Sequence, residues 1–488
     1  MSLNTKRIII AVIGLFFLGA LLVVGAIEGN KRIVGKKAAI KIPASSELCI
    51  DCHTVTTPSL VEQWRDSKHA LKGVACFDCH EAEKTEVDAW DHEGFLIAVI
   101  VSPKDCSKCH QTQNDQFQAS HHADAGKILG SLDNVLAEVV EGDTHRLSLN
   151  GASPAAVNGC WQCHGSVVKI MEDGRPDPST WPNTGIGRLN PDGSKGSCTA
   201  CHSRHNFSMA VARGPDSCGK CHMGPDHPQK EIYEESKHGI AFKANLEYMN
   251  ITAQPWRVGI EYTAAPTCAT CHMSATADQP VTHDVGKRIS WTLRPPISEK
   301  IDAKAIKDGK QVESWQDRRE NMMNVCASCH SDLYVEGFYR QFDSAVNLYN
   351  EKYGIPSTKL IKMMKAGGVL TPVAFDEPLE WTYFFLWHHE GRRARHGASM
   401  MAPDYTQWHG FFEVAKRFYI HFVPETREAC EKAIRKGGKA AATARAVLKE
   451  LDKILNTDEH RWFLGKMPAE EKKRRKAAAA EFKKRYVQ

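Results

Sequence analysis

The stretch CTACHSRHNFSMAVARGPDSCGKCH, residues 198–222, contains the pentapeptide Cys-x-x-Cys-His twice. The same pentapeptide recurs along the first two thirds of the chain, and its eight copies, with two cysteines each, account for all but one of the 17 cysteines. One copy could arise by chance, whereas eight copies indicate a repeated chemical requirement. The copies are Cys49–His53, Cys76–His80, Cys106–His110, Cys160–His164, Cys198–His202, Cys218–His222, Cys268–His272 and Cys326–His330.

This spacing has a chemical reason. Two thiols three residues apart can each add to one vinyl group of a haem, and the histidine that follows then reaches the iron as proximal ligand. Zinc sites, thioredoxin-like redox pairs and a disulfide framework are the alternatives, and none needs a histidine after every second cysteine. The sequence therefore predicts eight haem c groups. The predicted attachment residues are Cys49, Cys52, Cys76, Cys79, Cys106, Cys109, Cys160, Cys163, Cys198, Cys201, Cys218, Cys221, Cys268, Cys271, Cys326 and Cys329, and the predicted proximal ligands are His53, His80, His110, His164, His202, His222, His272 and His330.

Covalent haem attachment takes place on the outer side of the energy-coupling membrane, so an export signal is expected. Ile8–Ile27 (IIIAVIGLFFLGALLVVGAI) is an apolar run behind Lys6 and Arg7, long enough to span a bilayer. It predicts an uncleaved anchor with the rest of the chain on the periplasmic side. Gly25-Ala26 keeps a cleaved signal peptide as the alternative. The net charge of +5 over 488 residues does not indicate nucleic-acid binding.

The predicted fold is mainly α: a haem-packed part with sparse secondary structure, followed by a helical part. Apolar periodicity predicts helices over about 333–353, 379–395 and 405–422, with Pro356 interrupting the first and Pro424 ending the third. A last, charged helix is expected from Met467 to Tyr486; its run EKKRRK is interpreted as a solvated face, with anionic lipid as the alternative. The predicted segments are anchor 1–30, linker 31–48, octahaem domain 49–332, helical domain 333–430 and charged tail 431–488.

The chain has 23 histidines, so fifteen remain after the proximal ligands are assigned. Seven or eight of these would serve as distal ligands, depending on whether one haem stays open. Lone His460 is expected to be solvated, and Cys430, outside every motif, is expected to be a buried small hydrophobe. The candidate distal ligands are His69, His92, His121, His122, His145, His205, His238, His283, His388, His389 and His396.

Three segments carry a family resemblance: AVNGCWQCHG, HNFSMAVARGPDSCGKCHMGPDHPQKEIYEESKHGI and RRARHGASMMAPDYTQWHGFFEVAKRF. They resemble the octahaem hydroxylamine oxidoreductase family, over Cys49 to about Phe422. The resemblance implies that the fourth haem, on Cys160 and Cys163, is catalytic and open on its distal side. It also implies that Asp226 and His227 lie over that side as catalytic groups; the alternative is that Asp226 caps the helix near Pro228 while His227 binds iron.

The resemblance further implies that Tyr405 of one subunit crosslinks to the catalytic haem of its neighbour in a homotrimer, as in the hydroxylamine-oxidising members; a plain packing role is the alternative. It favours oxidation of hydroxylamine, or of hydrazine, to nitric oxide or nitrite, with electrons leaving through seven bis-histidine haems. Reduction of nitrite, nitric oxide or hydroxylamine to ammonium is the second hypothesis, and a non-catalytic electron conduit is the third. The implied redox partner is a cytochrome or a quinone-linked membrane protein.

Overall fold

The computed structural model describes residues 40–130 and 153–486. The predicted anchor at Ile8–Ile27 and the distal candidate His145 lie outside these ranges. The chain divides into two compact units, residues 1–78 and 79–488, and the segment boundaries predicted above stay predictions. Within the described ranges, no helix combines the length and apolarity needed to cross a membrane.

The first unit is a small cluster of short helices. Its core consists of Ile50, Val61, Trp64, Ala70 and Ala75, and the indole Nε1 of Trp64 donates to the carbonyl of residue 74 over 2.9 Å. The first haem motif lies in the second helix, where residues three apart share one side. The helices are η1 (Ala44–Ser46), α2 (Glu47–Thr56), α3 (Pro58–Arg65) and α4 (Lys68–Leu71).

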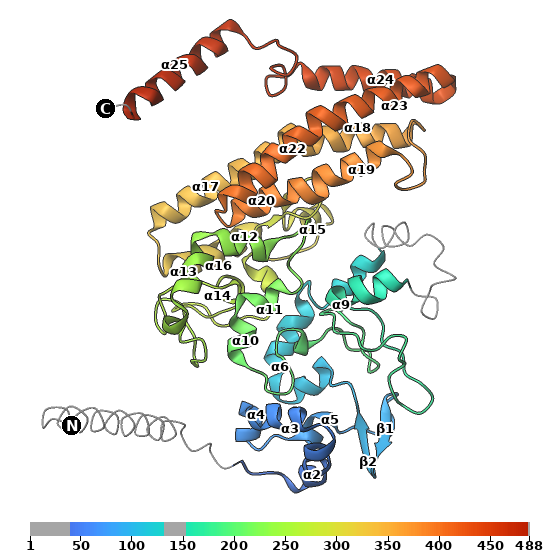
Figure 1. The fold of residues 1–488 in the computed structure, drawn as a ribbon, viewed down its shortest axis with the longest axis vertical. Coiled ribbons are helices and arrows are strands. Elements are labelled where there is room, and N and C mark those ends of the chain that lie inside the picture. The colour runs from blue at the N-terminus through green and yellow to red at the C-terminus, as the bar shows by residue number, and fades with distance from the viewer. Residues whose placement is uncertain (1–39, 131–152, 487–488) are drawn as a thin grey trace, which may run out of the picture. The chain divides into compact units, whose positions relative to one another are not determined.

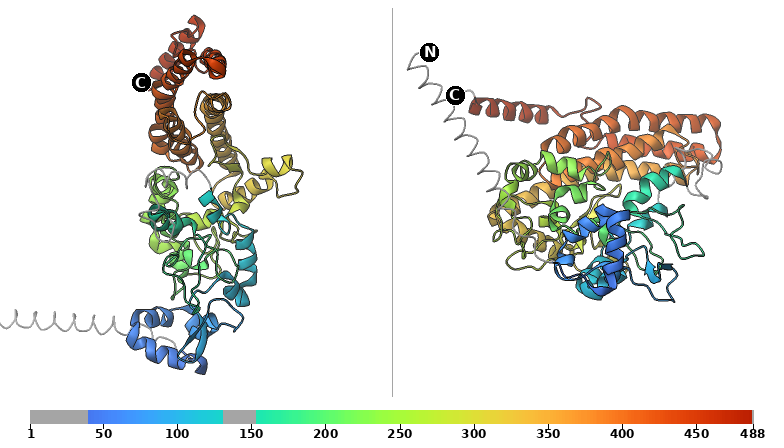
Figure 2. Two further views of the ribbon diagram at one scale, coloured as in Figure 1. Left: turned by 90° about the vertical axis from the view of Figure 1, so that its right-hand side faces the viewer. Right: turned by 60° about the horizontal axis from the view of Figure 1, so that its bottom comes forward.

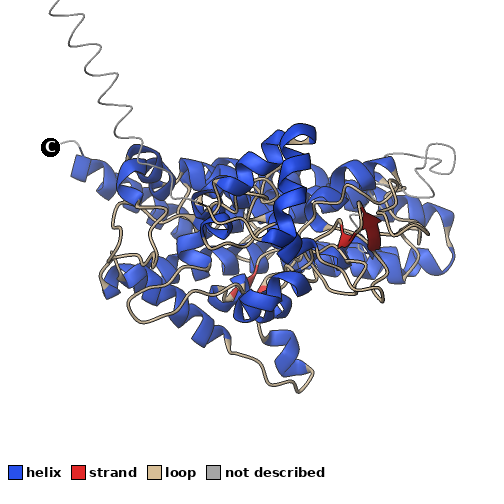
Figure 3. Cartoon of the chain, turned by 90° about the horizontal axis from the view of Figure 1, so that it is seen from below, coloured by secondary structure: helices blue, strands red, loops and turns tan. Residues whose placement is uncertain are grey.

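The motif-bearing part of the second unit consists of short helices joined by long loops (Figure 3). Two small antiparallel sheets interrupt it, one formed by β1 (Ala89–His92) and β2 (Phe95–Ala98), the other by β3 (Trp291–Thr292) and β4 (Glu299–Lys300). The helices that bear or flank motifs are α5 (Cys76–His80), α6 (Pro103–Ala119), η3 (Ala156–Cys160), α9 (Trp161–His164), η4 (Cys198–Ala200), α10 (Met209–Arg213), α11 (Pro215–Gly219), α12 (Gln229–Glu235), α13 (Lys237–Ala244), α14 (Cys268–His272) and α16 (Trp315–Ala327). Among them, α5 spans the division between the units.

Long helices that run side by side make up most of the rest of the second unit (Figures 1 and 2). Three of them contain π-helical turns without a break in the helix. The first joins α17 (Asp332–Tyr349), η7 (Asn350–Gly354) and α18 (Ile355–Ala366); the second joins α19 (Pro378–Phe384), η8 (Phe385–Glu390) and α20 (Gly391–Ser399). The third joins α21 (Pro403–Thr406), η9 (Gln407–Phe412), α22 (Glu413–Lys416), η10 (Arg417–Phe422) and α23 (Val423–Lys436), and is followed by α24 (Gly438–Leu455) and α25 (Ala469–Tyr486).

The largest apolar core of the described residues lies among these long helices. Tyr349, Leu360, Phe418, Phe422 and Leu451 are among its fully buried members. Cys430 is also fully buried there, which confirms its predicted role as a small hydrophobe. The mainly α fold predicted from the sequence is confirmed.

Two predicted helix breaks are wrong. The first helix continues through Pro356, and the third continues through Pro424 to Lys436. Each proline follows directly on a π-helical turn, in which the regular α ladder of hydrogen bonds is already interrupted, so the missing proline N–H costs little there. The first helix ends instead at Gly367 and Gly368, and Gly368 has a positive φ of 71°.

The prediction for His460 is also wrong. Its side chain is buried, with 2% of the residue exposed, and its Nδ1 lies 2.8 Å from the hydroxyl of Tyr419. The ring also stacks on Phe418 with centroids 5.2 Å apart. A histidine in a segment of polar neighbours (NTDEHRW) reads as exposed, but the turn after α24 folds it back into the apolar core.

Candidate haem and active site

Cysteines of different motifs lie close to one another in the second unit. The side chains of Cys163 and Cys221 hydrogen bond, which lowers the pKa of Cys163 to about 6 and raises that of Cys221. The same kind of thiol contact lowers the pKa of Cys198 and of Cys268 and raises that of Cys106 and Cys218. These contacts place the third motif beside the fifth, the fourth beside the sixth, and the sixth beside the seventh.

Three predicted distal histidines face predicted proximal histidines at a spacing that fits a shared iron. A metal–imidazole bond is roughly 2 Å long, so two axial rings on one iron have centroids about 6 Å apart. The ring centroids of His238 and His330 are 6.1 Å apart, those of His122 and His222 are 6.1 Å apart, and those of His202 and His283 are 6.5 Å apart. The side chains therefore fit haems held by the eighth, sixth and fifth motifs.

Burial also keeps these rings in the form that binds iron. Burial, with Arg294 and His121, lowers the pKa of His122 to about 4, and burial with His122 and Arg294 lowers that of His222 to about 3. Both rings are therefore neutral near pH 7, as a metal ligand must be.

The remaining distal candidates are spread over both units. His69 lies in α4, His92 at the end of β1, and His121 beyond α6. Burial, with His80 and Arg204, lowers the pKa of His205 to about 4, and burial with neighbouring charges likewise lowers that of His389 to about 4. His388, His389 and His396 lie on the second long helix, in η8 and α20; the Nε2 of His396 is buried without a hydrogen-bond partner among the described residues.

Asp226 and His227 form the hydrogen-bonded pair that the resemblance implies. Oδ1 of Asp226 lies 2.5 Å from Nδ1 of His227, and the other ring nitrogen, Nε2, lies 2.9 Å from the carbonyl oxygen of Cys221. The carboxylate does not cap α12, whose N-cap is Pro228. Because Cys221 adjoins Cys163, the pair sits where the fourth and sixth motifs meet, and Sγ of Cys163 lies 3.9 Å from the carbonyl of residue 220.

A residue that the sequence did not point to completes this cluster. Arg392, on α20, donates from Nη1 to Oδ2 of Asp226 over 3.0 Å and from Nε to the carbonyl of Arg294 over 2.8 Å. Nε2 of His388 lies 3.9 Å from the same Oδ2. More than 160 residues separate Arg392 from Asp226, so only the packing of α20 against α12 brings them together. In the sequence, the run GRRARH shows a concentration of positive charge but does not indicate the partner of any of its arginines.

Cations dominate the electrostatics around Asp226. Burial alone would raise the pKa of Asp226, but the hydrogen bond and charge of His227, with His388 and Arg392, outweigh it and hold the pKa well below its ordinary value. Asp226 is therefore ionised at any physiological pH. Burial lowers the pKa of Arg294 and of Arg395. A guanidinium group nevertheless stays charged in proteins.

Tyr405 lies in α21, close to α12. Its backbone N–H donates to Oε1 of Glu235 over 3.3 Å, and its ring lies 5.4 Å from that of His409. Burial, with Glu231 and Glu235, raises the pKa of the phenol. The side chain of Tyr405 is partly exposed. Its crosslink to another subunit stays a prediction.

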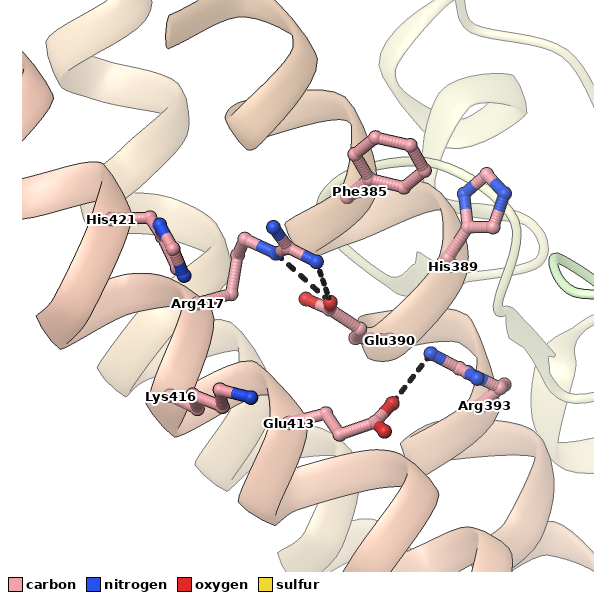
Figure 4. Close-up of a pocket in the computed structure, with 8 residues that line it drawn as sticks. All are labelled: Phe385, His389, Glu390, Arg393, Glu413, Lys416, Arg417 and His421. Carbon is pink, nitrogen blue, oxygen red and sulfur yellow. Dashed lines mark hydrogen bonds and ion pairs between the residues drawn. The ribbon is translucent and has the colours of Figure 1, made fainter.

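A polar cavity of about 490 Å³ lies between the second and third long helices, and His389 is among the residues that line it (Figure 4). Two ion pairs cross it: Arg417 donates to Oε1 of Glu390 from Nε and Nη2 over 2.9 and 2.7 Å, and Arg393 pairs with Glu413 over 2.7 Å. Its walls come largely from the π-helical turns η8 and η10, and such turns are frequent at functional sites.

Comparison with known proteins agrees with this arrangement. Residues 189–374 match the family model "Seven times multi-haem cytochrome CxxCH", and residues 14–93 match "NapC/NirT cytochrome c family, N-terminal region". A curated relative, a "probable nitrite reductase-hydroxylamine oxidoreductase fusion protein" of Kuenenia stuttgartiensis, is 27% identical over 331 residues, 59% of this chain. The match spans about a third (34%) of that relative's length.

Two solved structures share the fold. A "hypothetical multiheme protein" superposes with a TM-score of 0.70 at 25% identity, covering 82% of this chain and 98% of its own. A "reducing HAO-like protein complex" of Kuenenia stuttgartiensis superposes with a TM-score of 0.58 at 21% identity, covering 80% of this chain and 87% of its own. The chain is thus a mainly α-helical multihaem c-type cytochrome, and it shares its fold with a solved HAO-like multihaem protein.

Proposed function

We propose that the chain is an oxidoreductase of small nitrogen compounds that carries eight haems and works at the haem on Cys160 and Cys163. His164 would hold that haem on its proximal side, and Asp226 and His227 would serve the open side. An iron with an open axial position supplies a binding place for the nitrogen atom of the substrate and a route for electrons. The close cysteine contacts between the fourth and sixth motifs support electron exchange between those two haems.

The hydrogen bonds of His227 favour the reductive direction, and this observation carries the proposal. Nδ1 faces the Asp226 carboxylate and Nε2 faces the Cys221 carbonyl, and both of these groups can only accept. Both ring nitrogens are satisfied together only when each bears a proton. His227 is then arranged as a proton donor, with Asp226 balancing its charge and Arg392 fixing the carboxylate.

Proton supply is what reduction needs. Nitrite takes up six electrons and eight protons to give ammonium and two waters, and hydroxylamine takes up two electrons and three protons to give ammonium and one water. A reduced cytochrome or a quinol-linked protein would supply the electrons. The cations near the pair, Arg294 and the buried Arg392, also favour an anion such as nitrite over neutral hydroxylamine.

Oxidation of hydroxylamine, the direction that the resemblance implies, remains the second candidate because the segment around Tyr405 resembles the one that carries the crosslinking tyrosine. In that direction hydroxylamine and water give nitrite, four electrons and five protons, and His227 would accept protons. A homotrimer linked through Tyr405 and an N-terminal membrane anchor at Ile8–Ile27 belong to this proposal as well. A denaturing gel with a haem-bearing trimer, lost in Tyr405→Phe, would favour oxidation.

Steady-state assays in both directions test the proposal. We expect the purified holoprotein to reduce nitrite with a reduced dye faster than it oxidises hydroxylamine with an oxidised dye. His227→Gln should lower nitrite reduction at least tenfold and change its pH profile, whereas His409→Gln, at an exposed position, should leave both unchanged. Faster hydroxylamine oxidation would overturn the reductive assignment, and the absence of any high-spin haem signal would leave only the electron conduit.

A further inference from the structure

The last helix, α25 (Ala469–Tyr486), separates its charges onto different sides. Its sequence AEEKKRRKAAAAEFKKRY has eight basic and three acidic side chains, and none of its residues is buried. At about 100° per residue, the five lysines fall within an arc of about 120°, shared only with alanines. We call this arc the lysine face: Lys472, Lys473, Lys476, Lys483 and Lys484.

The three glutamates of α25 lie outside the lysine face, and arginines pair with two of them there. Glu471 pairs with Arg475 over 2.6 Å and with Arg461 over 3.5 Å, and Glu481 pairs with Arg485 over 3.5 Å. None of the five lysines forms an ion pair with a residue that the structure describes. Ion pairs with arginine thus lie on one side of the helix, and the lysines of the lysine face are exposed on the other.

An exposed aromatic pair borders the lysine face. Phe482 and Tyr486 are 64% and 75% exposed, and their ring centroids lie 4.8 Å apart. Amphipathic rings beside lysines are typical of segments that lie at a membrane–water interface. The helix has no apolar stripe of its own, so contact would be electrostatic, with the two rings at the headgroup level.

We propose that the lysine face of α25 binds the anionic phospholipid surface of the membrane. Lysine is a flexible point charge, which suits a fluid anionic surface, whereas arginine suits the fixed carboxylates of a protein partner. Two of the three arginines of α25, Arg475 and Arg485, are already engaged in this way with its own glutamates. The inference rests on the proposed N-terminal anchor, which would hold the chain at a membrane, and does not depend on the direction of the redox reaction.

Hydrogen exchange of the full-length holoprotein in reconstituted vesicles tests this. With phosphatidylcholine alone, the amides of residues 470–486 should exchange rapidly. Addition of phosphatidylglycerol to about a third of the lipid should slow their exchange several-fold, and high salt should reverse the effect. Replacing the five lysines of the face by Gln should abolish the slowing.

The matched control replaces five exposed lysines of α23 and α24 by Gln, so that the net charge changes equally: Lys432, Lys436, Lys439, Lys449 and Lys453. We expect this variant to behave as the wild type. Equal loss in the control, or no slowing with phosphatidylglycerol in the wild type, would overturn the proposal. Slowing by soluble polyglutamate but not by phosphatidylglycerol would assign the lysine face to an acidic protein instead. Nitrite assays on the same samples report the proposed function separately.

Discussion

At the scale of single residues, Asp226 owes its ionised state first to the adjacent His227, and it owes its orientation also to Arg392, which lies far away in the sequence. The two oxygens of the carboxylate have different partners, His227 on Oδ1 and Arg392 on Oδ2. A backbone carbonyl holds the guanidinium from its other side. The orientation of the proposed proton donor therefore depends on a side chain 166 positions away in the sequence.

Arg392→Gln should remove the ion pair that Arg392 makes with Asp226. Because the cation helps to hold the pKa of Asp226 below its ordinary value, the variant should lose stability on the order of 2 kcal/mol at neutral pH. A carboxyl with a depressed pKa stabilises the fold above its unfolded pKa and loses that contribution as the pH falls. Thermal unfolding from pH 7 to pH 3 should thus show a shallower acid loss in Arg392→Gln, and a curve parallel to the wild type would contradict the role of Arg392.

His460 gives a second pH-dependent contribution, away from the haem motifs. Burial, with the charge of Lys352, lowers its pKa to about 4, so the unfolded chain binds more protons than the folded chain between pH 4 and the ordinary histidine value. Stability therefore falls as the pH drops through that window. His460→Phe should remove on the order of 2 kcal/mol of this dependence in urea titrations at pH 7 and pH 5. His409→Phe, on an exposed histidine, serves as the control.

At the scale of elements, the π-helical turns decide where the long helices continue. Helical periodicity in the sequence located the three helices, and the glycines at 367, 368 and 437 end the first and third as glycines commonly do. The breaks predicted at Pro356 and Pro424 were wrong, because a π-helical turn has no compositional signal in the sequence and so could not be foreseen there. Two π-helical turns, η8 and η10, also line the polar cavity.

Pro424→Ala tests this account of the third helix. If the π-helical turn η10 already accommodates the missing N–H, the free energy of unfolding should change by less than about 1 kcal/mol. Ala442→Pro, at an exposed position inside α24, should instead cost about 3 kcal/mol. Urea unfolding of both variants measures this. Equal costs would show that the turn before Pro424 gives no protection.

At the scale of the whole molecule, apolar packing is distributed unevenly. The largest core joins residues between Tyr349 and Leu455, whereas the motif-bearing segments have only small clusters, such as that around Met249 and Trp256. Haems are the apolar material that those segments would pack against. Stability of the motif-bearing part should therefore depend on haem, and that of the long helices should not.

Hydrogen exchange on chain matured with and without haem attachment measures this difference. The mass of the matured chain should increase by eight haems. Without haem, amides of residues 165–207 should exchange orders of magnitude faster, while those of 403–455 should keep most of their protection. Equal loss of protection in both segments would show a single cooperative unit.

The sequence by itself determined the haem chemistry, because attachment and proximal ligation are local and five adjacent residues specify each site. It also determined the helical class and the Asp226–His227 pair, whose partners are neighbours in the chain. Tertiary structure alone decided which distal histidine faces which motif, that Arg392 holds Asp226, and that His460 is buried. Each of these contacts joins residues tens or hundreds of positions apart. Their free energy comes from burial and electrostatics in the folded chain, and neither produces a spacing pattern in the sequence.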